Sequence, residues 1–284
     1  MTAIRSAGLA LVVASMLCWA SSSTAYIALP KESLAQKVAV ADCVVLGKIT
    51  AIQDKPAPGK GEMRGWDFTI VEVEVKESLY GAKDKKQVGF GFPNIDKQGA
   101  KPAKPGLTVG QVGYFCGLRD GTNDFYIVPA GCSGAEKEPG FEKDLTAVRR
   151  LSGLLEAPEE GLKSTDVEDR LLTASMLVLR NCYAPWRRGS VGTAKPIDAE
   201  QSKRILRALA EGDWKKNRQE VRHAVAALQL AVKFGAPPLK DFPVEKEEEQ
   251  WTAAAKEWLK QNAETYRIHQ LWINAKKSPM SKSP

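Results

Sequence analysis

The spacing of apolar residues changes once along this sequence, near Pro139, and this change constrains the fold more than any other feature. Before it, apolar residues alternate with polar ones in short runs, which is the period-two pattern of strands. After it, they recur every three or four residues, as in amphipathic helices. The sequence therefore predicts an α+β protein, with its strands first and its helices second.

The first half contains five runs with strand character, separated by loops rich in Lys, Pro and Gly. Gly89 and Gly91 lie inside the third run, where they indicate tight curvature or a close backbone approach. Five short strands that curl and close predict a small β-barrel of the OB type. The runs cover residues 41–52, 66–75, 87–92, 111–118 and 124–130, and the last two are expected to form a hairpin.

The run at residues 41–52 is the one around which the others are expected to assemble. It is rich in β-branched residues, apolar on both faces in its first half, and alternating later. In the second run, Phe68 and Ile70 fall on the opposite parity from Val71. That switch predicts either a β-bulge or a strand buried on both faces.

The N-terminus has the pattern of a secretory signal peptide. Residues 7–20 are nearly all apolar, Arg5 is the only charge before them, and Ser-Thr-Ala at residues 23–25 provides the small residues of a cleavage site. The mature protein is therefore expected to begin at Tyr26 and to be exported, to the periplasm or beyond the cell. No later segment is apolar enough to predict a membrane span. The expected division is a signal peptide (1–25), a barrel domain (26–135), a helical domain (139–273) and a disordered tail (274–284).

Three motifs in the barrel region point to a family. They are Ala-Asp-x-Val-Val-x-Gly-Lys-Ile (41–49), Val-x-Val-x-Glu-Ser-Leu-Tyr-Gly (73–81) and Val-Gly-x-Val-Gly-Tyr-Phe (109–115). Together they resemble the OB-fold, netrin-like N-terminal domain of exported bacterial proteins, which is related in fold to tissue inhibitors of metalloproteinases. The resemblance covers about residues 38–135. It implies a five-stranded OB barrel.

Cysteine usage fits an exported protein. Cys43, Cys116, Cys132 and Cys182 follow the signal segment, and an even count favours disulfides, with zinc binding as the alternative. No Cys-x-x-Cys pair is present, so a zinc ribbon or thioredoxin-type site is not indicated. In an OB barrel, strands one and four are antiparallel neighbours, which implies a disulfide between Cys43 and Cys116. Three pairings are open to four cysteines, and Cys132 with Cys182 would link the two domains.

The second half contains five helical runs joined by short connections, with residues 186–196 as a loop. A HEAT-like array or an irregular helical bundle is predicted, without a clean repeat. Residues 265–273 alternate in polarity and indicate a late strand or a docked segment. The helical runs cover residues 141–155, 165–183, 198–211, 220–234 and 247–262.

Two of these runs carry helix-start signals. Thr165 with Glu168 has the spacing of a capping box that begins the second run, and Asp198 with Gln201 is expected to cap the third. The last run is expected to bury Trp251, Ala255, Trp258 and Leu259.

Catalytic and metal-binding motifs are not found in the sequence. His223 and His269 lie far apart, and there is no His-Glu-x-x-His, Gly-x-Ser-x-Gly or phosphate-loop pattern. Residues 131–134, Gly-Cys-Ser-Gly, resemble a nucleophile turn, but Pro139 delays the helix that should follow, so they are interpreted as a turn. No catalytic residue, metal site or cofactor is predicted.

Two groups of residues are candidates for ligand contact. Phe90 and Phe92 lie on the third strand, where OB folds often bind ligands, but packing in the barrel core is the favoured interpretation, because five strands must fill the barrel interior. Trp186, Arg187 and Arg188 form either a cation–π or anion-binding patch or a Trp packed beneath the helical domain.

The net charge of +7 admits an anionic partner. The lysines are scattered, however, so nucleic acid is not expected. The sequence favours an exported, non-enzymatic binding protein whose partner is another protein or an anionic component of the envelope. The alternatives are a protease-inhibitor-like protein, by analogy of fold, and a hydrolase with its site at the domain junction.

Overall fold

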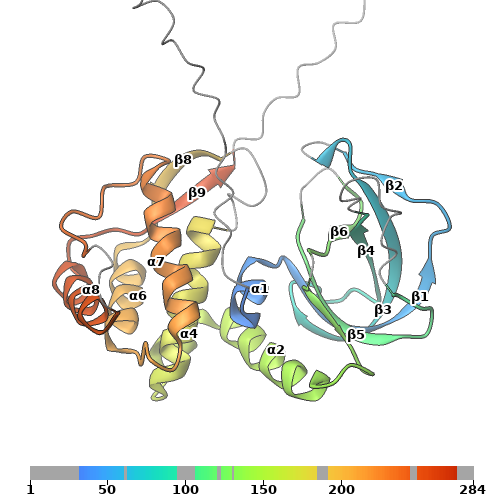
Figure 1. Cartoon of the computed structure of the whole chain (residues 1–284), viewed down its shortest axis with the longest axis horizontal. Helices are drawn as coiled ribbons and strands as arrows, with labels where there is room; N and C mark the ends of the chain where they lie inside the picture. Colours follow the sequence, from blue (N-terminus) through green and yellow to red (C-terminus); the bar gives the residue numbers. More distant parts are fainter. Residues whose placement is uncertain are drawn as a thin grey trace, which may run out of the picture. The chain divides into compact units, whose positions relative to one another are not determined.

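The computed structural model describes residues 32–60, 63–94, 106–119, 123–129, 131–183, 191–243 and 248–273. The expected signal peptide, residues 186–188 and the C-terminal tail lie outside these described residues. Within them the protein is a mixed α+β structure with one curled sheet, one two-stranded sheet and seven α-helices (Figure 1). The chain from Ser33 onward belongs to one compact unit.

The curled sheet is built around the first long strand, as expected. β1 pairs antiparallel with β3 on one side and with β5 on the other, and β4 follows β3. The strands are β1 (Cys43–Ile52), β2 (Ala57–Pro58), β3 (Asp67–Tyr80), β4 (Gln87–Pro93), β5 (Val112–Gly117), β6 (Tyr126–Ile127) and β7 (Ser133–Ala135).

The sheet curls until its two ends approach each other. Its strand order is β6-β4-β3-β1-β5-β7, and an antiparallel bridge between Leu118 and Ile127 connects the end of β5 back to β6. Register shifts between β1 and β3 supply the bulges that bend a sheet in this way. Ile70 and Val71 are both buried, so β3 is covered on both faces at the position where the parity changes.

The expected hairpin between the fourth and fifth runs is wrong in its main pairing. β6 pairs in parallel with β4, and its contact with β5 is limited to the bridge at Leu118. Gly91 explains the difference, because a Cβ at this position would lie 2.3 Å from the ring of Phe125. Because Gly91 has no side chain, the residues around Phe125 can pack against β4. This contact joins segments that are distant in the sequence, so the local pattern of a hairpin does not predict it. β5 instead pairs with β7, a short strand in the segment interpreted as a turn.

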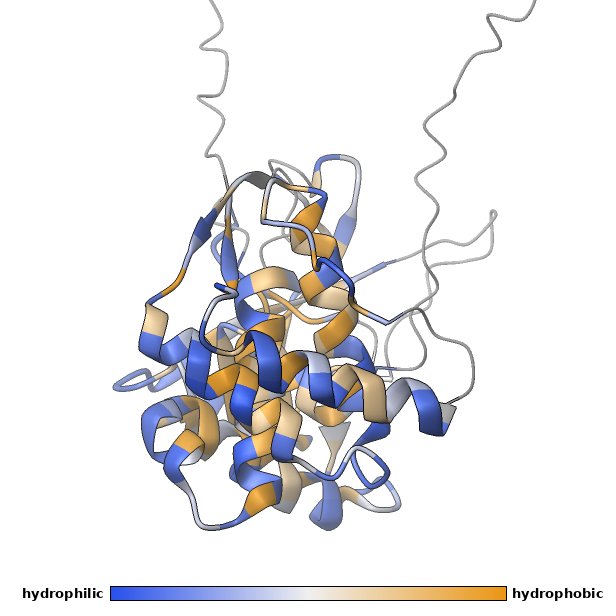
Figure 2. Cartoon of the chain, turned by 90° about the vertical axis from the view of Figure 1, so that its left-hand side faces the viewer, coloured by the Kyte–Doolittle hydropathy of each residue, from blue (hydrophilic) through white to orange (hydrophobic). Residues whose placement is uncertain are grey.

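The helices follow the expected stripes. The buried positions of α2 include Phe141, Leu145, Val148, Leu151 and Leu155. Helices at the surface carry hydrophobic residues along one side and hydrophilic residues along the other (Figure 2), whereas residues 171–178 of α4 are buried on every side. The helical elements are α1 (Leu34–Val40), α2 (Phe141–Glu156), α3 (Pro158–Lys163), α4 (Val167–Val178), the π-helical turn η3 (Leu179–Tyr183), α6 (Ala199–Glu211), α7 (Arg218–Val232) and α8 (Glu248–Asn262).

Two helix starts test the capping signals. The carboxylate of Asp198 accepts a hydrogen bond from the amide of Gln201 at 2.9 Å, which confirms the expected cap of α6. The expected capping box at Thr165 is wrong by one position. Asp166 is the cap of α4, and its carboxylate accepts from the amide of Glu168 at 2.8 Å.

Two elements, α1 and β8, form in segments for which the sequence predicts no helix or strand. α1 lies in the lead-in, where its seven mostly apolar residues carry too little periodicity to be recognised. β8 (Val191–Pro196) lies in the expected loop and pairs antiparallel with β9 (His269–Ile273). The late-strand interpretation of residues 265–273 is thereby confirmed for β9.

Candidate functional site

The two phenylalanines singled out on β4 lie in the barrel core. Phe90 is 0% exposed, and its ring stacks on that of Phe115 with the centroids 5.4 Å apart. Phe92 is 7% exposed and meets the edge of Phe115 at 6.4 Å. Of these two residues, Phe92 lines a pocket of about 350 Å³, beside Val128 and Pro129. Core packing therefore accounts for Phe90, and Trp186, Arg187 and Arg188 lie outside the described residues.

The cysteine register disfavours the expected bridge between Cys43 and Cys116. β1 and β5 are neighbours, as expected, but Cys43 is opposite Gly117 and Cys116 is opposite Val44. A one-residue offset between paired strands directs two side chains to opposite faces of the sheet. All four cysteines are buried, and the thiol of Cys182 contacts the carbonyl oxygen of His269 at 3.3 Å in the helical part.

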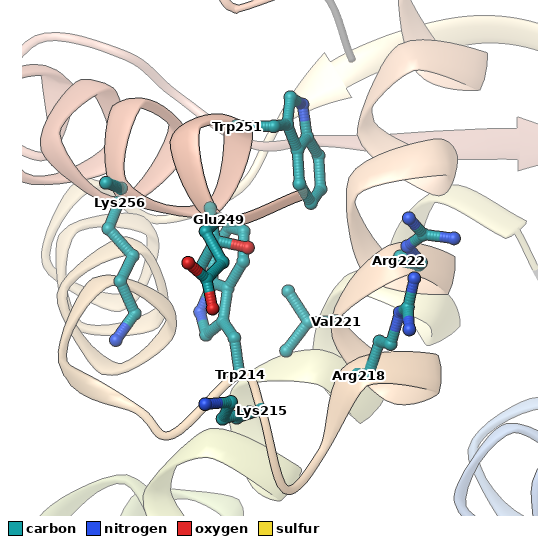
Figure 3. Close-up of a pocket in the computed structure, with 10 residues that line it drawn as sticks. Trp214, Lys215, Arg218, Val221, Arg222, Glu249, Trp251 and Lys256 are labelled. Atoms are coloured by element: carbon teal, nitrogen blue, oxygen red, sulfur yellow. The ribbon is translucent and has the colours of Figure 1, made fainter. Parts of the chain in front are cut away.

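A more promising site lies between α7 and α8. A pocket of about 510 Å³ opens there, bounded also by the connection between α6 and α7 (Figure 3). We call it the tryptophan pocket. Its lining consists of Trp214, Lys215, Arg218, Val221, Arg222, Glu249, Trp251, Thr252, Ala253 and Lys256.

The floor of the tryptophan pocket is apolar and rigid. Trp214 is 4% exposed and Trp251 is 8% exposed, with their ring centroids 5.5 Å apart. The indole N–H of Trp214 donates to the carbonyl oxygen of Leu209 at 2.7 Å, and that of Trp251 donates to Pro243 at 3.3 Å. Because both polar ends are occupied, the rings present carbon to the pocket.

The rim of the pocket is cationic. Arg218 and Arg222 are one turn apart on α7, so they project from the same face of that helix. Figure 3 shows them on the α7 side and Lys256 on the α8 side, with the tryptophans between. Lys215 adds a fourth cation, and Glu249 is the one carboxylate in the described lining.

The two lysines of the pocket differ from a neighbouring lysine in their ion pairing. Lys216, next to Lys215, forms an ion pair with Glu168, which raises the pKa of Lys216. In the part of the chain that the structure describes, the side chains of Lys215 and Lys256 form no such pair. Lys215 and Lys256 therefore add positive charge beside Arg218 and Arg222, and the four cations together attract an anion to the pocket.

A groove of about 740 Å³ between α6 and α8 adjoins the tryptophan pocket and shares Lys256 with it. Its charges are largely compensated. Glu264 pairs with Lys203 at 2.7 Å and also with Arg207, and these contacts lower the pKa of Glu264. The groove thus has carboxylates paired with its cations, whereas the described lining of the tryptophan pocket has four cations and one carboxylate.

The remaining reactive groups are not gathered into a site. His223 is buried on α7, and the Nδ1 of His269 lies 2.7 Å from the carbonyl oxygen of Arg267. Burial raises the pKa of Cys43 to about 12 and that of Cys182 to about 12, so both are poor nucleophiles at neutral pH. Among the described residues, no three or more His, Cys, Asp or Glu side chains are placed to hold a metal ion.

Comparison with protein-family models, with curated proteins and with solved structures gave no match. Within the described ranges, every helix is too short or too polar to cross a membrane.

The tryptophan pocket was missed by reasoning from the sequence. Its cations come from the α6–α7 connection and from two helices that are distant in the chain, so no local run of basic residues marks it. One local signal was present: Trp214 and Lys215 precede Arg218 and Arg222, which are spaced to share a helix face. Two arginines one turn apart can donate hydrogen bonds to one anion from the same side of a helix.

Proposed function

We propose that this chain is an exported, non-enzymatic binding protein with an OB-type, netrin-like barrel, and that its tryptophan pocket binds an anionic ligand of the envelope. The strand order supports the OB type. β1 lies between β3 and β5, β6 runs parallel to β4, and the Leu118–Ile127 bridge joins β5 to β6. OB folds are five-stranded Greek-key barrels that serve widely as binding modules.

One observation carries the proposal: four cations surround an apolar aromatic floor in a single pocket. Guanidinium and ammonium groups form strong, charge-assisted hydrogen bonds to carboxylate and sulfate oxygens. Indole carbon provides a surface for the apolar face of a ring. Each repeating unit of an acidic polysaccharide carries an anionic group and a sugar ring with an apolar face. We therefore assign a carboxylate- or sulfate-bearing sugar chain as the ligand.

Binding fits the pocket better than hydrolysis does. Glycoside hydrolysis uses two carboxyl groups that flank the reacting bond. The described lining offers only one carboxylate, that of Glu249. The lining therefore supports the binding function over the hydrolase alternative.

The inhibitor alternative has less support from the sequence. Metalloproteinase inhibitors of the related fold chelate zinc through an N-terminal cysteine, whereas the expected first residue here is Tyr26. The mature protein should leave zinc proteases uninhibited at micromolar concentration. Tight inhibition that is lost on acetylation of the α-amine would overturn this expectation.

Binding to defined sugars tests the proposed function. The mature protein should bind a heparin oligosaccharide or an oligogalacturonate, but not neutral dextran, in isothermal titration. The double variant Lys215→Gln/Lys256→Gln should bind about tenfold or more weakly, since it removes two cations from the rim.

A charge-matched control separates the pocket from net charge. Lys143→Gln/Lys163→Gln removes two exposed lysines from α2 and α3, away from the pocket lining, and should change the affinity less than twofold. Equal losses in the two double variants, or equal binding of dextran, would contradict the assignment.

A further inference from the structure

The register between β5 and β7 places two cysteines opposite each other. Phe115 pairs with Ser133, and Tyr114 pairs with Gly134. Extending this antiparallel register by one residue sets Cys116 against Cys132. The amide of Cys116 donates to the carbonyl oxygen of Cys132 at 2.8 Å, which places the two residues side by side, while the amide of Cys132 donates to the carbonyl oxygen of Pro129.

Opposed residues of an antiparallel pair project from the same face of the sheet. Their Cα atoms are about 5.5 Å apart at a hydrogen-bonded pair, within the range of roughly 4.4–6.8 Å that disulfides span. The competing partners are less well placed. Cys43 projects from the opposite face to Cys116, and the Sγ of Cys182 donates to the carbonyl oxygen of His269 at 3.3 Å in the helical part.

We propose that Cys116 and Cys132 are joined by a disulfide in the exported protein. The bridge forms by exchange with a low-molecular-weight disulfide. One thiolate attacks it and releases one reduced thiol, and the second thiolate then displaces the other, so that two cysteine protons and two electrons leave the protein.

The timing of this exchange follows from burial. Cys116 is 2% exposed and Cys132 is 1% exposed, and burial raises the pKa of Cys116. Exchange therefore takes place before the strands close, or when β7 opens. β7 has three residues at the edge of the sheet, so it separates from β5 more readily than a central strand would.

The bridge would secure the closure of the barrel. The segment between the two cysteines contains Leu118 and the two-residue strand β6, which together connect β5 to β4. A covalent bond at the ends of this segment limits how far it can move from the sheet. It also fixes β7, from which the chain continues to α2.

Peptide mapping without reduction tests the pairing. Mature protein is refolded with a mixture of oxidised and reduced glutathione, alkylated in denaturant, and digested with trypsin, which cleaves after Arg119 between the two cysteines. Mass spectrometry should find the Cys116 peptide linked to the Cys132 peptide, with Cys43 and Cys182 alkylated. The variant Cys43→Ser should give the same linked peptide.

A link from Cys43 to Cys116, a link from Cys132 to Cys182, or alkylation of both Cys116 and Cys132 would overturn the proposal. Protein secreted by the producing cells is mapped in parallel, because the proposal rests on the proposed export. A link found after refolding but absent from the secreted protein would overturn the disulfide in the exported protein. Failure to recover any secreted protein, with the link still found after refolding, would contradict export and leave the pairing supported.

Discussion

The guanidinium of Arg180 lies over the ring of Tyr80, with its central carbon 4.9 Å from the ring centroid. The same group donates to the carbonyl oxygens of Ala39 at 3.3 Å and Ala41 at 3.0 Å. One side chain from the π-helical turn thus contacts the end of β3 and satisfies carbonyl groups at the end of α1. These carbonyls have no partner within their short helix, so Arg180 serves as its C-terminal cap.

Replacing Arg180 should destabilise the protein more than an ordinary surface substitution does. Arg180→Leu loses the cation–π contact and two charge-assisted hydrogen bonds, which together contribute about 3 kcal/mol. Arg180→Lys should lose part of this, because an ammonium cannot hold both carbonyls and the ring. Urea unfolding measures the loss, with the exposed Arg64→Leu as control. Unfolding of Arg180→Leu at the wild-type midpoint would contradict the capping role.

The cap of α6 should make stability depend on pH. Hydrogen bonds from backbone amides, that of Gln201 first, lower the pKa of Asp198 from its usual 3.8. A lowered folded-state pKa stabilises the fold above the unfolded-state pKa, and the effect is lost as the pH falls through the folded-state value. Wild type should therefore be more stable than Asp198→Asn at pH 7, and this advantage should shrink below pH 3.8. Denaturant curves at both pH values measure it, and a pH-independent difference would argue against this cause.

Local signals were enough to predict much of the fold. The apolar run of β1, the cap at Asp198 and the buried stripe of Trp251, Trp258 and Leu259 each lie within one segment, where spacing alone identifies them. Elements that depend on distant partners were missed. β6 takes its parallel pairing from the space at Gly91, and β8 pairs with β9 from the far end of the helical part.

The candidate site illustrates the same limit. Arg218 and Arg222 belong to α7 and Lys256 belongs to α8, and only the packing of the two helices brings these charges together. The placement of Cys116 beside Cys132 was missed for a related reason. Strand adjacency was predicted for Cys43 and Cys116, but register decides which side chains share a face, and register is not readable from strand order.

The proposed disulfide should stabilise the protein measurably. On the chain-entropy model, closing a loop of this length contributes roughly 3 kcal/mol, which corresponds to about 6–12 °C in Tm for a domain of this size. Adding dithiothreitol to the oxidised protein should lower Tm by that amount. The variant Cys116→Ser/Cys132→Ser should have the lower Tm with or without reductant. A wild-type Tm that does not respond to reductant would contradict the prediction.

Ligand binding should be sensitive to salt. The four cations at the rim of the tryptophan pocket are near solvent, where dissolved ions screen them. Raising the ionic strength from about 0.05 M to about 0.5 M should weaken binding of a sulfated oligosaccharide by about tenfold or more. The titration is repeated with Lys215→Gln/Lys256→Gln, whose affinity should depend less on salt. Identical salt dependence in wild type and variant would place the binding charges elsewhere.

The central claim, that an anionic sugar binds in the tryptophan pocket, is tested most directly by the indole N–H resonances in ¹H–¹⁵N NMR spectra. Trp258 is the internal control, because its N–H donates to the carbonyl oxygen of Lys240 and it does not line the pocket. Titration with a heparin oligosaccharide should shift the resonances of Trp214 and Trp251 in a saturable way and leave that of Trp258 unchanged. Saturable binding that shifts neither Trp214 nor Trp251 would contradict the account.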